Sequence, residues 1–560
     1  MNSVIDSSIF KSSMELITIR SCRSRNMSSD QYQCIVSGTN LIMACLLLTN
    51  ICSNSFISTA QASDDQTQGY IFTHIDEEFV SSSTSRKLVS SETSLLAQCL
   101  AIGGARTAFP GTTAYTNARI VNNLRNRYAP AAFVFPTTIA QVQNAVHCAK
   151  QSAVCIAPRG GGHSYEDYSL GGRDGCLVVD MTGFTAISYN NAAQTATIGS
   201  GWRLGPLYLA LWNLGKVTIP AGNCVTVGVA GHALGGGWGF SSRKFGLVAD
   251  NILDAQLVTA NGTLVIANAQ QNSDLYFALR GAGANSYGIV VEFSFRVHDV
   301  SGPITRFQYF WTNKTQQFQA FKGFQIWGAN AVPEISASFY LDPFGNSNIE
   351  GVYLGPQASL PPLIKSFLAN TPPASSSTTQ QSDWITLILQ NGGFPTGSNP
   401  DVLNLKNYPL PTNTFKAKSI YVNAPAGLSD AGITAMLNSM HSDSNDNAFF
   451  LFDLYGPTSN INQVAADATA FVHRSSLFSI QMVAYWSIAA QESTDFTFLD
   501  NSWNTVRPFA TPQAYQNYID RDMPLTAYYG SNLNPLIEIK QRWDSQNLFN
   551  FPQSIPLVLT

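Results

Sequence analysis

Residues 158–172 read PRGGGHSYEDYSLGG, and His163 directly follows three glycines. Gly160, Gly161 and Gly162 have no Cβ, so they can adopt positive φ angles and let the backbone come close to a bound ligand. Successive backbone N–H groups in such a turn favour a ligand that carries phosphate. The stretch therefore predicts a loop that holds a large cofactor and presents His163 to it.

A second glycine-rich stretch, residues 221–239, reads AGNCVTVGVAGHALGGGWG and presents Cys224 and then His232. One glycine-rich loop alone is a weak signal, because any tight turn can require glycine. The pairing is more specific, since it indicates one large cofactor held by two loops. The G-x-G-x-x-G fingerprint does not follow a strand and open a helix here, which argues against a nicotinamide-binding Rossmann fold.

Two further stretches follow, GLVADNILDAQLVTANG at residues 246–262 and DLYFALRGAGANSYGIVVEF at residues 274–293. The combination resembles the FAD-linked oxidases of the berberine bridge enzyme-like family, and the C-terminal segments NYIDRDM and PQSI match that family as well. The resemblance implies an α+β fold. In it, a two-part PCMH-type FAD-binding domain is joined to a substrate domain with an antiparallel sheet covered by helices.

The composition is that of a globular chain with several parts. Of the 560 residues, 45% are hydrophobic and only 12% are charged, and the length is too great for a single compact domain. A formal net charge of −4 supplies no broad basic field, which argues against a nucleic acid or an anionic membrane surface as a partner. We expect a monomer that acts on a small molecule, and no metal site.

Changes in composition divide the chain. Residues 63–94 are acidic and rich in serine, without periodicity, which is typical of a flexible linker. The Ser/Thr/Gln-rich residues 371–382 are expected to form an exposed loop. We expect a leader at residues 1–62, the linker at 63–94, the FAD-binding domain at 95–300, the substrate domain at 301–504, and a C-terminal segment at 505–560 that returns to the FAD-binding domain.

The leader contains an apolar run at residues 41–52, LIMACLLLTNIC, and Ala60-Gln61-Ala62 gives an A-x-A cleavage pattern. A run of about twelve residues is too short to span a bilayer and suits a signal peptide. The residues before it are many for a signal, which an internal start at Met27 or an amino-terminal membrane anchor would explain. A wrongly assigned start or a buried helix is the alternative. We expect a secreted protein, with a membrane partner only if the leader is an uncleaved anchor.

The sequons at Asn261 and Asn313 agree with secretion and predict a glycoprotein.

Five of the nine cysteines lie beyond the leader. The family resemblance implies a disulfide between Cys99 and Cys148. Cys155 and Cys176 flank the His163 loop on expected strands, where they are either a second disulfide or two small core residues, and we favour core residues. Cys224 is then the odd cysteine, as expected if its sulfur is otherwise engaged.

The resemblance also implies how the cofactor is held. His163 matches the histidine that family members attach to the flavin 8α-methyl group, and Cys224 matches the cysteine that they attach to ring carbon 6. The implied cofactor is therefore bicovalent FAD, and each bond should raise the flavin's potential. The alternatives are a loop histidine bound to backbone carbonyls and a buried, inert cysteine. The other positions that match the family's cofactor-binding residues are Arg159, Gly160, Gly161, Gly162, Ser164, Val227, Gly228, His232 and Gly236.

Two of these positions have more specific implied roles. His232 matches the histidine that stabilises the reduced flavin at its N1–C2=O edge, although a core histidine satisfied by the backbone is the alternative. Val227 matches the position beside the oxygen-reactive carbon, where a valine leaves room for O2. The resemblance therefore implies an oxidase that yields H2O2.

The substrate half carries the expected catalytic residues. Tyr518 matches the family's base and Asp453 the carboxylate that carbohydrate oxidases pair with it. A phenol with a pKa near ~10 needs such help at neutral pH. Gln481 and Tyr165 match substrate-contacting positions, although either can simply line a pocket.

The chain also departs from its relatives. Ser479 stands where members that oxidise monolignols have lysine, and Leu451 stands where many relatives have glutamine. The resemblance then favours oxidation of the anomeric hydroxyl of a mono- or oligosaccharide to a lactone. An oxidase of an alcohol or alkaloid-like metabolite is the first alternative, and a catalytically idle flavin-binding or storage protein is the second.

Overall fold

The computed structural model describes residues 18–23, 33–37, 61–62, 70–71, 89–282, 285–404, 410–441 and 447–559, with side chains from residue 95 onward. The chain divides into two units, residues 1–83 and 84–560. The first contains two antiparallel strand pairs, β1 (Thr18–Arg23) with β2 (Gln33–Ser37) and β3 (Gln61–Ala62) with β4 (Tyr70–Ile71). The apolar run expected at residues 41–52 lies outside the described residues. Among the helices that are described, none has the length and apolar character to cross a membrane.

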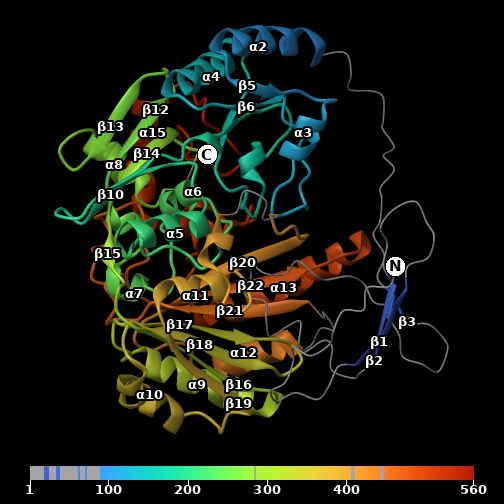
Figure 1. Cartoon of the computed structure of the whole chain (residues 1–560), viewed down its shortest axis with the longest axis vertical. Coiled ribbons are helices and arrows are strands. Elements are labelled where there is room, and N and C mark those ends of the chain that lie inside the picture. Colours follow the sequence, from blue (N-terminus) through green and yellow to red (C-terminus); the bar gives the residue numbers. More distant parts are fainter. Residues whose placement is uncertain are drawn as a thin grey trace. The chain divides into compact units, whose positions relative to one another are not determined.

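The second unit begins with a four-stranded sheet covered by two helices (Figure 1). Helix α4 (Ile139–Gln151) buries Val142, Ala145, Val146 and Ala149 along one face, and the Thr138 hydroxyl caps it by accepting from the Gln141 N–H. Helix α2 (Val89–Gly103) begins within the range expected to be linker and is joined to α4 by the predicted disulfide between Cys99 and Cys148. The sheet order is β5-β6-β8-β7, with bounds β5 (Arg106–Ala108), β6 (Ala132–Phe135), β7 (Ile156–Arg159) and β8 (Leu177–Asp180).

Cys155 and Cys176 form a second disulfide, so the interpretation as two small core residues was wrong. Strands β7 and β8 are parallel neighbours, with Ile156 opposite Leu177. The two preceding residues therefore face each other with their Cα atoms 4.6 Å apart, which is within disulfide range.

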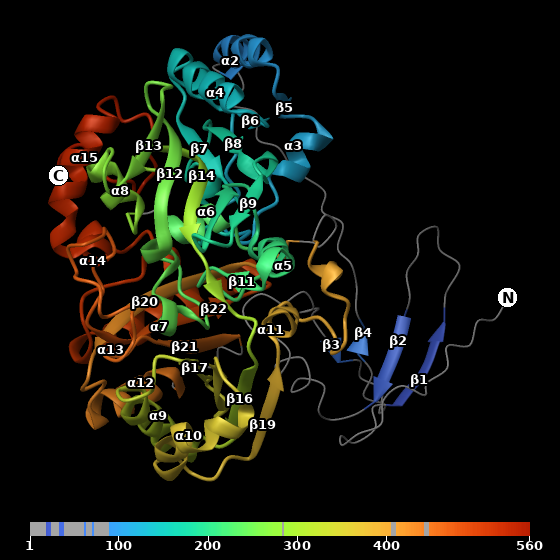
Figure 2. The same ribbon diagram turned by 60° about the vertical axis from the view of Figure 1, so that its left-hand side comes forward.

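A five-stranded antiparallel sheet forms the second part of the flavin-binding half (Figure 2). Alternate residues of its strands, such as Phe293 and Phe295, pack into the largest core together with α5 (Leu204–Gly215) and α15 (Leu533–Trp543). The Tyr287 hydroxyl donates to the Leu536 carbonyl at 3.0 Å, which joins the C-terminal helix α15 to this part. The sheet order is β13-β12-β14-β10-β9, with bounds β9 (Ile187–Asn190), β10 (Thr195–Gly199), β12 (Ile252–Thr259), β13 (Leu264–Asn268) and β14 (Gly288–Arg296).

The remaining large element is a seven-stranded antiparallel sheet with helices on one face (Figure 1). Its order is β19-β16-β18-β17-β21-β22-β20, with bounds β16 (Ile304–Trp311), β17 (Ile335–Leu341), β18 (Ser347–Tyr353), β19 (Ser376–Ser382), β20 (Phe415–Asn423), β21 (Ala448–Leu454) and β22 (Ser476–Tyr485). The covering helices are α9 (Lys314–Gly328), α10 (Leu360–Ala369), α12 (Asp430–His441) and α13 (Glu492–Val506). The expected α+β fold with a helix-covered antiparallel sheet is confirmed.

The alternating side chains of strand β21 show which face of this sheet packs against the helices and which faces away from them. Phe450 and Phe452 pack into the helix-covered core, where the Phe452 and Phe321 rings are 4.5 Å apart. Because successive strand residues point to opposite faces, Leu451 and Asp453 face away from the helices. Residues 376–382, expected to be loop, instead form the edge strand β19, in which all residues but the last are exposed.

Candidate functional site

The two glycine-rich loops lie in direct backbone contact. A Cβ on Gly161 would lie 2.3 Å from the Gly228 nitrogen and 2.9 Å from the Thr226 carbonyl oxygen, so only glycine allows this approach. The His163 Nε2 lies 2.9 Å from the Thr226 hydroxyl. The structure thus brings together the loops that carry His163 and Cys224.

His163 is an uncharged imidazole in this position. Burial, and then the nearby Arg203 guanidinium, lower its pKa to about 3. At any working pH the ring therefore keeps a lone pair on one nitrogen, which is the form able to act as a nucleophile.

Cys224 lies two residues before Thr226, and its sulfur is disulfide-bonded in the structure. A thioether bond to a flavin requires the sulfur as a thiolate. A flavin link at Cys224 therefore requires this disulfide to be open.

His232 is satisfied in part by the backbone. Its Nε2 accepts from the Gly222 N–H at 2.9 Å, and burial lowers its pKa to about 4. The ring is thus neutral with its proton on Nδ1, so it can offer a hydrogen bond but not a positive charge to a ligand.

Other expected cofactor-binding residues have local roles. The Arg159 guanidinium forms an ion pair with Asp180, to which its Nε donates at 2.8 Å, and also donates to the Ala118 carbonyl. The Ser164 hydroxyl accepts from the Tyr168 N–H at 3.0 Å. Gly236 has a φ of 117°, and a Cβ there would lie 2.9 Å from the Phe471 ring. Val227 packs, half-buried, against the main core.

The site fits a large flat cofactor. Gly231, beside His232, is exposed, and a Cβ on it would meet no atom within 4 Å. The glycines of the two loops, the open space at Gly231 and the neutral imidazole of His163 are compatible with a flavin between these loops. Among the described residues no group of histidine, cysteine or carboxylate side chains is suited to a metal ion.

Facing these loops, the tyrosine and the carboxylate predicted for catalysis are hydrogen-bonded. The Tyr518 hydroxyl donates to Asp453 Oδ2 at 2.9 Å, and the Ser338 hydroxyl donates to Oδ1 at 2.8 Å. Burial raises the pKa of Asp453 to about 6, although both hydrogen bonds oppose the shift. Burial and the Asp453 charge raise the pKa of Tyr518 well above its usual range. Near neutral pH the pair is therefore a carboxylate that accepts from a phenol.

The expected substrate-contacting pair lies beside them. Gln481 Nε2 donates to the Tyr165 hydroxyl at 2.6 Å, and the rings of Tyr165 and Tyr518 are nearly parallel with centroids 5.7 Å apart. The Gln481 Oε1 is buried without a hydrogen-bond partner in the described structure. Because Tyr165 belongs to the His163 loop, this contact joins that loop to strand β22 of the seven-stranded sheet.

Sequence reasoning missed Ser338. It lies opposite Asp453 in the pairing of β17 with β21, although 115 residues separate them along the chain. No local sequence pattern predicts such a cross-strand partner, because the sequence of one strand does not determine which strand pairs with it.

Two family models match the chain. One, described as "FAD binding domain", matches residues 130–268, and the other, "Berberine and berberine like", matches residues 514–556. The first covers both glycine-rich loops, and the second covers Tyr518.

Curated and solved relatives agree with these matches. The chain is 31% identical to the chitooligosaccharide oxidase of Gibberella zeae over 82% of this chain and 93% of that protein. It is 66% identical to the structure of Physcomitrella patens BBE-like 1, with a TM-score of 0.81 over 83% of this chain and all of that chain. It is 27% identical to the structure of a glucooligosaccharide oxidase from Acremonium strictum, which is described with a 6-S-cysteinyl, 8α-N1-histidyl FAD, with a TM-score of 0.76 over 83% of this chain and 100% of that chain.

Proposed function

The chain belongs to the berberine bridge enzyme-like family of FAD-linked oxidoreductases, and on that premise we propose that it oxidises a sugar. The reaction converts the anomeric hydroxyl of a mono- or oligosaccharide to the lactone, and O2 takes the electrons and becomes H2O2. The observation that carries the proposal is the hydrogen bond between Tyr518 and Asp453, with the Tyr518 ring stacked on Tyr165 of the His163 loop. The names of the oligosaccharide-oxidising relatives support it.

The chain's own residues handle the hydroxyl proton. FAD, when bound, supplies the hydride acceptor. The Tyr518 oxygen takes the proton of the substrate hydroxyl while its own proton moves along the 2.9 Å hydrogen bond to Asp453 Oδ2. The phenol needs this relay because burial and the Asp453 charge disfavour a free tyrosinate. The Ser338 hydroxyl holds Oδ1 and so aims Oδ2 at the phenol.

Gln481 and Tyr165 orient the sugar. The Gln481 Nε2 is engaged with the Tyr165 hydroxyl, whereas its Oε1 has no partner among the described residues. A buried carbonyl oxygen without a partner is costly, and a sugar hydroxyl can donate to it. The neighbouring Leu451 on β21 makes no hydrogen bond through its side chain, so specificity at that position depends on shape.

FAD is bound covalently through His163 and Cys224 in this proposal. The neutral imidazole of His163 supports the first bond. The second requires Cys224 to have left its disulfide. His232 then offers its Nδ1–H near the flavin.

We propose that the protein is secreted. Two disulfides within the described residues, Cys99–Cys148 and Cys155–Cys176, favour an oxidising compartment. The sequon residues Asn261 and Asn313 are both exposed, as glycan attachment requires.

The test is peroxide release by the purified flavoprotein with glucose, cellobiose, chitobiose and two aromatic alcohols, beside the Tyr518→Phe variant. Peroxide with a sugar, reduced at least 100-fold in the variant, is the expected result. Turnover of an aromatic alcohol alone would replace the sugar by the alcohol class. No turnover of any compound by a protein with full flavin content would favour a binding or storage role.

A further inference from the structure

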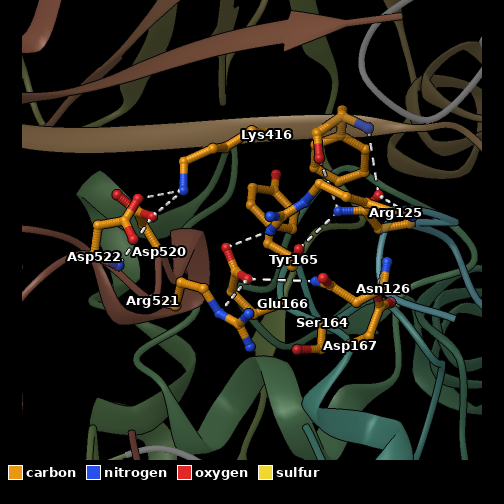
Figure 3. A network of polar contacts seen from close by, with 12 residues as sticks. Arg125, Asn126, Ser164, Tyr165, Glu166, Asp167, Lys416, Asp520, Arg521 and Asp522 are labelled. Atoms are coloured by element: carbon orange, nitrogen blue, oxygen red, sulfur yellow. Dashed lines mark hydrogen bonds and ion pairs between the residues drawn. The ribbon is translucent and has the colours of Figure 1, made fainter. Parts of the chain in front are cut away.

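A buried ion cluster is built around Asp520, close to Tyr518 in the chain. Asp520, two residues after Tyr518, is fully buried, and its two carboxylate oxygens meet two different lysines. Oδ1 accepts from Lys416 Nζ at 2.7 Å and Oδ2 from Lys418 Nζ at 2.8 Å. Figure 3 shows Lys416 reaching toward Asp520 and Asp522.

The two lysines share one face of the edge strand β20. They alternate with Ala417 and lie in line with Ile420 and Val422, which pack into the helix-covered core. The opposite face carries Ser419, whose hydroxyl oxygen accepts from the Tyr515 N–H at 2.9 Å. The segment that carries Tyr518 is therefore held on one face of β20 at Tyr515 and on the other face at Asp520.

The lysines are balanced by further carboxylates. Lys416 Nζ lies 2.6 Å from Asp522 Oδ2, and Lys418 Nζ lies 3.0 Å from Asp500 Oδ1 on α13. A buried ion pair stabilises a fold no more than apolar residues of similar size, while fixing which groups meet. The arrangement is thus better suited to set the position of the segment than to add stability.

A similar buried carboxylate, Glu166, lies next to Tyr165 in the chain. Its side chain is almost fully buried, with Arg125 Nη2 2.6 Å from Oε1 and Arg521 Nε 3.5 Å from Oε2. Because Arg521 directly follows Asp520 in the chain, the Glu166 ion pairs and the Asp520 ion pairs involve neighbouring residues of one segment (Figure 3).

We propose that Asp520, held by Lys416 and Lys418, is a positioning residue that fixes the Tyr518 hydroxyl against Asp453 and the Tyr518 ring against Tyr165. The inference rests on the proposed function, since it gives Tyr518 the role of base. Without the two lysine contacts to Asp520, that face of β20 keeps only the weaker hold of the Lys416–Asp522 pair on the segment, and the hydroxyl is less firmly confined to its place. Misplacement by about 1 Å can cost about 100-fold in rate.

The test is Asp520→Asn in the full-length flavoprotein, with rates corrected for flavin content. The matched control is Asp544→Asn. Asp544 follows the last residue of helix α15, is equally buried, and accepts a 2.7 Å hydrogen bond from Nζ of Lys540 in that helix. With the best sugar among glucose, cellobiose and chitobiose, Asp520→Asn should lower kcat about 10- to 100-fold with KM within about twofold. Asp544→Asn should change neither.

A merely structural role is separated by the double variant. In a Tyr518→Phe background the hydroxyl is gone, so adding Asp520→Asn should change the residual rate by less than about twofold. An unchanged kcat in Asp520→Asn, or the same loss in both backgrounds, would overturn the proposal. If Asp520→Asn does not accumulate as folded flavoprotein, Lys418→Gln, which leaves Lys416 on Asp520, is measured in the same way.

Hydrogen exchange of the backbone amides of residues 515–519 keeps this test independent of the substrate. Exchange there should be faster in Asp520→Asn than in the parent and in Asp544→Asn. If the parent oxidises no sugar, the proposed function fails. The exchange measurement still decides whether Asp520, held by Lys416 and Lys418, fixes the position of residues 515–519. Equal exchange in all three proteins would count against it.

Discussion

Tyr518 and Asp453 are 65 residues apart in the chain, yet the phenol of the first donates a 2.9 Å hydrogen bond to the carboxylate of the second. The carboxylate is on strand β21 of the seven-stranded sheet. The phenol lies in the C-terminal segment, which contacts both faces of the edge strand β20. Neither group is a strong base alone near neutral pH, because one pKa is raised to about 6 and the other lies well above its usual range. Together they give a proton path from the site to a buried carboxylate.

The rate should depend on pH through Asp453. Only the ionised carboxylate can accept the Tyr518 proton, and burial raises its pKa to about 6. We expect kcat with a sugar to fall as pH drops below about 6, by about tenfold for each pH unit, and to level off above about 7. Asp453→Asn should lose at least 100-fold and the acidic limb with it. A parent profile that stays flat down to pH 4 would contradict this role.

The stability of the fold should depend on the same group with the opposite sign. The pKa of Asp453 is raised from 3.8 to about 6 in the folded chain, so between these values the folded state holds more protons than the unfolded state. Stability contributed by this group is therefore lost as pH rises through about 4 to 6, by up to about 3 kcal/mol. Relative to the parent, Asp453→Asn should gain stability across that window. Melting temperatures of both proteins at pH 4, 5, 6 and 7 measure this, and a constant difference would contradict it.

Sequence patterns were informative where function depends on local chemistry. A stretch of a few residues is enough to predict each of three features. They are the glycine-rich loops, the helices that carry Cys99 and Cys148, and the strands with alternating aromatic residues. Two loops separated by some sixty residues come together because Gly161 and Gly228 let their backbones touch, and glycine is visible in a sequence.

What escaped prediction depends on strand register and order. Cys155 meets Cys176 only because β7 and β8 are neighbours in register, and Ser338 meets Asp453 only because β17 pairs with β21. Residues 371–382 are expected to form a loop because they are rich in Ser, Thr, Gln and Pro, but pairing with one partner strand, β16, is enough to form the exposed edge strand β19. These contacts are set by tertiary pairing, which no short window contains.

The amide of Gln481 and the hydroxyl of Tyr165 should act on binding more than on chemistry. Removing the hydroxyl in Tyr165→Phe deprives the Gln481 Nε2 of its 2.6 Å acceptor, a loss of about 1 kcal/mol. We expect KM for the sugar to rise about three- to tenfold while kcat changes by less than about threefold. The control is Tyr276→Phe, which removes the 2.7 Å hydrogen bond from the Tyr276 hydroxyl on helix α8 (Ser273–Leu279) to the Ile252 carbonyl on β12. It should leave KM unchanged. A large loss of kcat with unchanged KM would place Tyr165 in the chemical step instead.

The two disulfides should differ in their effect on stability. The bond between Cys99 and Cys148 closes a sequence separation of 49 residues and that between Cys155 and Cys176 one of 21. By the loop-closure estimate their removal costs about 4 and about 3 kcal/mol, respectively. Serine variants of each pair, compared by denaturant unfolding, measure the difference. Because residues 155–176 enclose the His163 loop, only the second pair should also lower flavin retention.

The linkage to FAD should be visible by mass after denaturation. In the parent we expect the flavin to stay attached, and Cys224 to be found bound to flavin rather than in a disulfide. His163→Ala should keep one bond through Cys224, Cys224→Ser should keep one through His163, and the double variant should release FAD on denaturation. Attachment that survives in Cys224→Ser but is lost in His163→Ala would show that the disulfide at Cys224 persists in the flavoprotein. Because a cysteinyl bond at ring carbon 6 withdraws electrons, Cys224→Ser should also lower the flavin's midpoint potential and slow its reduction by a sugar.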